Sequence, residues 1–87
     1  EQYSLEQNYP NPFNPSTKIS WQSPVGSHQI LKVYDVLGTE VATLVDDYRE
    51  AGTFEVEFNA SNLSSGVYFY KLQAGSYTQT KKMQLIK

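Results

Sequence analysis

Cysteine is absent from this 87-residue sequence, and histidine occurs only once, at position 28. Without cysteine there can be neither a disulfide framework nor a thiolate metal site. With His28 alone, no pair of imidazoles can hold a metal, and a nucleophile would have a single imidazole base. We therefore expect no catalytic residue, no metal site and no cofactor, and we expect His28 to be a solvated turn residue.

Long apolar runs and helical periodicity are also missing. No stretch is long enough for a signal peptide or a membrane span. The chain starts at Glu1 rather than methionine, so we expect a piece of a longer protein, with Lys87 as its natural C-terminus. Hydrophobic residues make up 39% and aromatic residues 14%, which is too rich in rings for a disordered tail. A chain of this size predicts one folded domain.

Charge is low overall but unevenly distributed. A net charge of −2 gives no reason to expect nucleic-acid binding. Seven acidic residues fall between positions 35 and 57 with Arg49 as the only base, whereas four lysines and no acid follow from Lys71 onward. The acids Asp46, Asp47 and Glu50 do not follow the alternating pattern of a calcium loop. We expect them to form a solvated acidic loop over residues 46–52.

Alternation of apolar and polar residues predicts an all-β chain. Glycine and proline turns separate the alternating runs, and an irregularity is expected near Leu44. The last strand is expected to bury Met83, Leu85 and Ile86. Six strands are predicted over residues 17–22, 28–36, 41–45, 53–59, 68–72 and 77–86, with a possible seventh over residues 3–7. Short strands at this spacing favour an immunoglobulin-like antiparallel β-sandwich of about seven strands, with an open barrel as the alternative.

Aromatic residues divide by their phase in these strands. Trp21 alternates with Ile19 and is expected in the core, whereas Tyr34, Phe69 and Tyr77 are out of phase and are expected at the surface. Tyr68 follows a leucine and a glycine turn, the pattern of a tyrosine corner, in which the hydroxyl bonds the backbone a few residues upstream.

Three prolines, Pro10, Pro12 and Pro15, lie within the stretch YPNPFNPST at positions 9–17. Each fixes φ and removes an N–H donor, which excludes a helix and a central strand. We expect residues 1–16 to form a stiff, extended lead-in that Tyr9 and Phe13 pin to a sandwich over residues 17–87.

Four ordered stretches resemble a known family. YPNPFNPSTKISW, VYDVLGTEV, LSSGVYFYKL and KKMQLIK are together similar to the C-terminal sorting domain of the type IX secretion system of Bacteroidetes, the Por secretion tail family. The resemblance covers about residues 9–87. It implies an immunoglobulin-like, non-catalytic sorting domain that directs an attached cargo through the periplasm to the cell surface. The implied partners are the outer-membrane secretion machinery, its sortase-like peptidase and an upstream cargo domain, with no nucleic acid and no membrane span.

The resemblance also assigns roles to individual residues. It implies that the basic terminal strand is the recognised signal, although its lysines are also typical gatekeepers of an exposed sheet edge. The Asn-Pro segment is expected to hold the upstream linker clear for processing, so that deleting residues 9–15 would impair export or processing while leaving the sandwich folded. The signal residues are Lys81, Lys82 and Lys87, and the structural motif residues are Asn11, Pro12, Asn14, Pro15, Asp35, Gly38, Gly66 and Tyr68.

Two alternative functions remain open at this point. The same turns occur in the immunoglobulin-like domain of flagellar hook-capping proteins, so the sandwich could be a structural or interaction module appended to a secreted enzyme. Exposed aromatic rings would instead favour carbohydrate binding.

Overall fold

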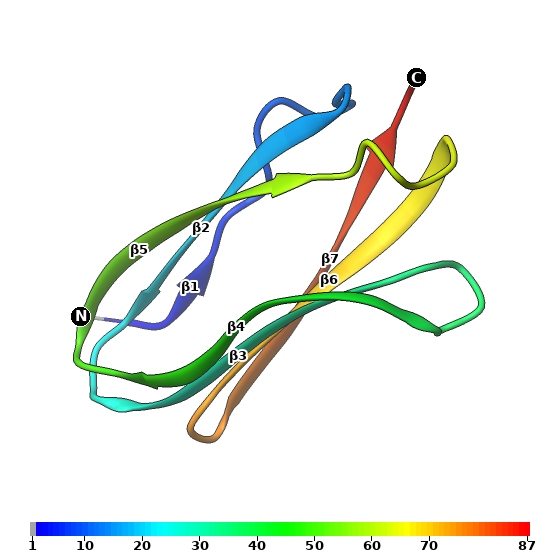
Figure 1. Cartoon of the computed structure of the whole chain (residues 1–87). Coiled ribbons are helices and arrows are strands. Elements are labelled where there is room, and N and C mark those ends of the chain that lie inside the picture. The colour runs from blue at the N-terminus through cyan, green and yellow to red at the C-terminus, as the bar shows by residue number, and fades with distance from the viewer. Residues whose placement is uncertain (1) are drawn as a thin grey trace.

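Two antiparallel sheets face each other in the computed structural model, which describes residues 2–87 (Figure 1). The strand order is β1-β2-β5 in the three-stranded sheet and β4-β3-β6-β7 in the four-stranded sheet. The predicted all-β sandwich is confirmed. The strands are β1 (Ser4–Leu5), β2 (Ser16–Ser23), β3 (Ser27–Tyr34), β4 (Glu40–Arg49), β5 (Gly52–Asn59), β6 (Gly66–Ala74) and β7 (Tyr77–Leu85).

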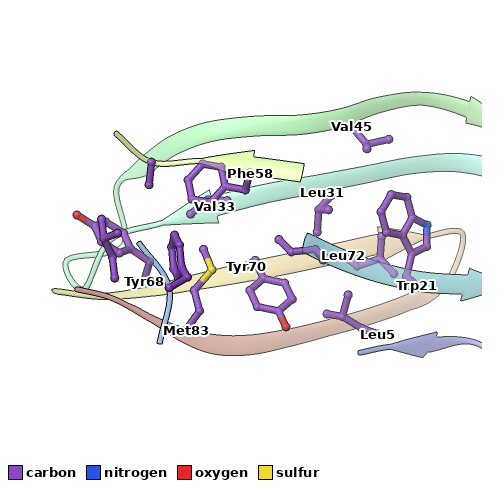
Figure 2. Close-up of a cluster of buried hydrophobic side chains, with 14 residues drawn as sticks. Leu5, Trp21, Leu31, Val33, Val45, Phe58, Tyr68, Tyr70, Leu72 and Met83 are labelled. Atoms are coloured by element: carbon purple, nitrogen blue, oxygen red, sulfur yellow. The ribbon is translucent and has the colours of Figure 1, made fainter. Parts of the chain in front are cut away.

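The core lies between the sheets because each strand turns its alternate apolar residues inward. Trp21 is completely buried, and its indole Nε1 donates a hydrogen bond of 2.8 Å to Gln29 Oε1. Figure 2 shows Trp21 and Leu72 toward one end of the core and Tyr68 and Met83 toward the other. The prediction that Trp21 packs in the core is confirmed, so its ring offers no surface to a carbohydrate.

Strand β4 is longer than the sequence predicted. It extends through Arg49, and Asp46 pairs with Ile30 of β3. The predicted acidic loop over residues 46–52 is therefore wrong. Backbone pairing with β3 does not depend on side-chain type, and an edge strand carries charged side chains without burying them. The predicted irregularity is confirmed, because two register shifts leave Val41 and Leu44 without a direct partner on β3.

Surface exposure departs from the prediction at four positions. Tyr34, Phe69 and Tyr77 are half-buried rather than exposed, and Tyr77 stacks on Tyr3 with ring centroids 4.7 Å apart. Ile86 is 48% exposed, whereas Met83 and Leu85 are each 1% exposed. Ile86 comes directly after Leu85, so alternation points its side chain away from the core.

The lead-in is bonded to both sheets. Tyr9 exchanges two backbone hydrogen bonds with Lys18 of β2, at 3.0 and 2.9 Å. The Phe13 N–H donates to Gln84 O of β7, and Phe13 O accepts from the N–H of Ile86, both at 3.0 Å. The Phe13 side chain is 2% exposed and belongs to the core, whereas Tyr9 is 80% exposed. Phe13 pins the segment as expected, and the Tyr9 side chain does not.

This packing overturns the expectation that residues 9–15 can be deleted from a folded sandwich. Such a deletion would remove a buried ring together with the backbone partner of the terminal strand. The surrounding side chains relax only partially when a buried ring is removed.

Tyr70 makes a second connection between the lead-in and the four-stranded sheet. Its hydroxyl donates to Glu6 O at 2.7 Å and accepts from the Asn8 N–H at 2.8 Å. Burial raises the pKa of Tyr70 to about 12, because a phenolate would lose its hydration; the Asn8 N–H opposes this shift and the nearby Glu6 charge adds to it. The side chain is completely buried in the core.

Replacing Phe13 with alanine is expected to lower the free energy of unfolding by about 3–5 kcal/mol, the usual cost of removing a buried phenylalanine. Tyr9→Ala, the matched change on an exposed ring of the same segment, should leave stability nearly unchanged. Urea denaturation followed by tryptophan fluorescence measures both. Equal effects of the two substitutions would show that Phe13 is not a core residue.

Tyr70 also predicts how stability depends on alkaline pH. Its pKa is about 12 in the folded chain and about 10 in the unfolded chain, so the unfolded state loses its proton first as pH rises. The stabilisation is complete below about pH 10 and is lost as pH rises toward about 12. Urea denaturation across this range should show a steeper loss for the wild type than for Tyr70→Phe. Parallel curves would contradict the assignment.

Candidate recognition surface

The terminal strand β7 forms one edge of the four-stranded sheet. Its inward residues Met83 and Leu85 anchor it in the core, while Lys82 and Gln84 are exposed. Within residues 2–87, no ion-pair partner of Lys82 is found. The strand therefore presents polar and cationic groups from a firmly held backbone.

Lead-in residues cover part of the β7 edge. Gln7 Nε2 donates to Lys82 O at 2.8 Å, and the Gln84 N–H donates to Asn11 Oδ1 at 3.0 Å. A side-chain oxygen thus replaces the strand partner that the Gln84 N–H would otherwise need. Residues near the two ends of the chain are joined here although they lie far apart in sequence.

A shallow hollow of about 160 Å³ lies at this junction. We name its lining the terminal-strand surface, and it combines the lead-in with outward and edge positions of β6 and β7. Its residues are Asn11, Pro12, Val67, Lys82, Met83 and Gln84. Three residues singled out in the sequence, Asn11, Pro12 and Lys82, therefore meet around one hollow.

The other two signal lysines lie elsewhere. Lys81 precedes Lys82 on the same strand and points to the opposite face, where it is half-buried and paired in register with Tyr70. Lys87 bonds the loop between β5 and β6: its Nζ donates to Ser61 O at 2.6 Å and its N–H to Ser65 Oγ at 3.0 Å. The three lysines do not form one cluster.

The remaining motif residues build turns. Asp35 Oδ1 accepts from the N–H groups of Leu37 and Thr39 at 2.9 and 3.0 Å, and Gly38 has a φ of +86° that a side chain would strain. Gly66 begins β6, and Tyr68 donates from its hydroxyl to Ser64 O at 2.7 Å. The predicted tyrosine corner is confirmed.

Asn14 and Pro15 complete the lead-in on the side of β2. Asn14 is exposed and Pro15 is half-buried. Pro15 O accepts a hydrogen bond of 2.8 Å from the N–H of Ala60, just beyond the end of β5. These two residues do not line the hollow beside β7.

The sequence did not predict Val67 and Gln84 as residues of this surface. The alternation of β6 does indicate that the Val67 side chain points outward. Val67 and Phe69 both alternate with the buried Tyr68, so they lie on the other face of β6. Phe69 pairs in register with Tyr34 on β3 and with Lys82 on β7. Val67 and Phe69 therefore place half-buried apolar side chains on the outer face of this sheet.

Glu40 of β4 and Lys32 of β3 form an ion pair on the four-stranded sheet. Glu40 is the register partner of Tyr34, and its Oε1 lies 3.2 Å from Lys32 Nζ. A hydrogen bond from Thr43, followed by that from Lys32, lowers the pKa of Glu40, and the hydrogen bond with Glu40 raises the pKa of Lys32.

The candidate catalytic and metal groups of the sequence do not converge. His28 is exposed and pairs with Asp46 at 2.6 Å, and Asp47 pairs with Arg49 at 3.1 Å. No group of three or more histidine, cysteine, aspartate or glutamate side chains suited to a metal occurs in the described part of the chain. Residues 2–87 contain no helix that is long and apolar enough to cross a bilayer.

Comparisons with known proteins agree with this architecture. One solved structure with the same fold is PorZ, an essential surface component of the type IX secretion system of Porphyromonas gingivalis, with a TM-score of 0.64 and 21% sequence identity. The similarity covers 98% of this chain but only 11% of that one, so the chain corresponds to a small part of PorZ. At this identity the likeness shows the fold alone. No curated protein matches the chain in sequence.

The family model for the secretion system C-terminal sorting domain matches residues 7–87. The match includes the Asn-Pro segment, the two glycine turns and the terminal strand. This chain belongs to the family of secretion system C-terminal sorting domains, the sorting signals of type IX secretion.

Proposed function

We propose that this domain is a non-catalytic sorting signal and that the outer-membrane secretion machinery binds it at the terminal-strand surface. Lys82 is proposed to be the main cation of this surface. The proposal rests on one observation: Asn11 and Lys82 line the same hollow. The hydrogen bond from the Gln84 N–H to Asn11 Oδ1 links the lead-in to β7 at this place. Lys81 and Lys87 are proposed to contribute from the opposite face of β7 and from the end of the chain.

A surface built from both ends of the domain forms only when the domain has folded. Asn11 reaches Gln84 only if Phe13 is inserted in the core and β7 is paired with β6. The machinery would therefore distinguish a folded domain from an unfolded one at this place. Free peptides carrying only the last residues would lack Asn11 and Pro12 and bind poorly.

The charge distribution indicates how the domain would be oriented. The terminal-strand surface carries a cation, whereas Glu55, whose register partner is Ser20, points outward from β5 on the other sheet. Complementary potentials steer association and fix register. We expect the binding site of the machinery to be acidic, so that it attracts β7 and repels β5.

The finer steps of export are also part of the proposal. We propose that the cargo precedes the domain in the same chain, passes through the periplasm to the cell surface, and is released there by a sortase-like peptidase. A peptidase needs an accessible, extended chain, but between Ser4 and Phe13 the backbone is bonded to β2 or β7 at several positions, namely Ser4–Glu6, Tyr9 and Phe13. Cleavage is therefore expected upstream of Ser4.

We propose a division of roles within one folded unit, between the lead-in (residues 1–16) and the sandwich (residues 17–87). The lead-in supplies Asn11 and Pro12 to the surface, and the sandwich supplies β6 and β7. Asn14 and Pro15 are proposed to guide the chain from this surface into β2.

Lys82→Gln is expected to reduce export of a fluorescent reporter fused ahead of the domain, in a host that has the secretion system. Lys71→Gln is the matched control: it removes the same charge from the outer face of the same sheet but does not line the hollow. Cell-surface and periplasmic fluorescence measure the two outcomes, and circular dichroism of the purified domains checks folding. Loss of export should be several-fold for Lys82→Gln and small for Lys71→Gln.

Asn11→Ala tests whether the lead-in is part of the same surface. It should reduce export as Lys82→Gln does while the domain stays folded, because Phe13 remains buried. Normal export of both variants would reject the terminal-strand surface as the signal. Equal losses for the Lys71 and Lys82 variants would show that total charge, and not this place, is read.

A further inference from the structure

A second hollow, of about 280 Å³, lies on the outer face of β2 beside the lead-in. It shares no residue with the terminal-strand surface. Tyr9 stands out in its lining because the side chain is 80% exposed and takes no part in the core. The lining residues are Tyr9, Pro10, Ser16, Thr17, Lys18 and Glu57.

The backbone around this hollow is rigidly held. Tyr9 exchanges two backbone hydrogen bonds with Lys18. Pro10 O accepts from Thr17 Oγ1 at 2.8 Å and from Asn8 Nδ2 at 3.2 Å, and the Asn8 and Thr17 side chains are themselves bonded at 2.9 Å. Asn8 and Thr17 are both buried. The hollow is therefore preformed, which lowers the entropic cost of binding a ligand.

The charged groups of the lining balance each other. Lys18 and Glu57 are direct partners in the pairing of β2 with β5, and both are exposed. Together with the Ser16 hydroxyl they offer hydrogen-bond donors and acceptors without net charge. This combination suits a neutral ligand that carries both kinds of group, and it disfavours a simple anion or cation.

Backbone pairing with a peptide strand is disfavoured at this position. The edge of β2 at Lys18 is already occupied by Tyr9, since the N–H and C=O of each residue bond the other. A peptide added at a sheet edge would need those groups. The volume lies near the lower limit for ligand pockets, which favours a single ring over an extended chain.

We propose that this hollow binds the pyranose ring of a neutral sugar. The Tyr9 ring and Pro10 would contact the apolar face of the sugar, because an aromatic ring combines a large apolar surface with a defined geometry. Lys18, Glu57 and Ser16 would bond its hydroxyl groups. The site is independent of the terminal-strand surface and would give a sorting domain a carbohydrate contact of its own.

Titration of the whole ¹⁵N-labelled chain with the methyl pyranosides of glucose, galactose and mannose tests the proposal by NMR. At least one sugar should shift the amide signals of Thr17, Lys18 and Glu57 at millimolar concentration. Tyr9→Ala should weaken binding by about tenfold, the upper range for one aromatic contact. Tyr48→Ala, on a tyrosine that is also exposed, at 61%, is the matched control and should bind as the wild type does.

Two further variants distinguish the contribution of the polar groups to binding from that of the Tyr9 ring. Glu57→Gln and Lys18→Gln should each weaken binding without unfolding the domain, since both side chains are exposed. An absence of shifts with all three sugars would overturn the proposal. Shifts at these residues with hexaproline peptide in place of the sugars would overturn it too, because they would assign the hollow to a peptide. Equal loss for the Tyr9 and Tyr48 variants would show that the binding is not at this place.

Discussion

The insertion of Phe13 between the two sheets is the contact on which the rest of the structure depends. Its ring fills the core, and its N–H and C=O bond Gln84 and Ile86 on the terminal strand. One residue therefore closes the sandwich and covers its exposed edge at the same time. The prolines on either side limit the conformations of the unfolded segment, so less entropy is lost when Phe13 is fixed in place.

This contact explains how a small domain can act as a signal. A sequence motif near the start of the chain and another at its end become one surface only through the backbone of Phe13 and Gln84. Tyr70 strengthens the same connection from inside the core by bonding both Glu6 and Asn8. The surface that the machinery is proposed to read is thus a property of the folded state, in contrast to a linear peptide tag.

Predictions from the sequence succeeded where a short-range rule applied and failed where a partner strand decided the outcome. Trp21 in phase with Ile19, and Tyr68 after a glycine turn, were assigned correctly because both depend on local spacing. The prediction of a loop from Asp46 to Arg49 was wrong. The charges of this segment suggested a loop, whereas its backbone pairs with β3. The prediction that Ile86 is buried was wrong, because it ignored the alternation of side chains that turns Ile86 away from the core next to the buried Leu85.

Alternation and turn residues by themselves determined an antiparallel sandwich with Trp21 in its core, because these features are set by neighbours within a few positions. Four ordered motifs spread along the chain indicated the sorting family by resemblance. Only the tertiary structure decided that Asn11 meets Lys82, that Lys81 and Lys87 lie apart from it, and that Tyr9 borders a second hollow. Those relations depend on how one sheet is placed on the other, which is fixed by packing across the core between residues distant in the chain.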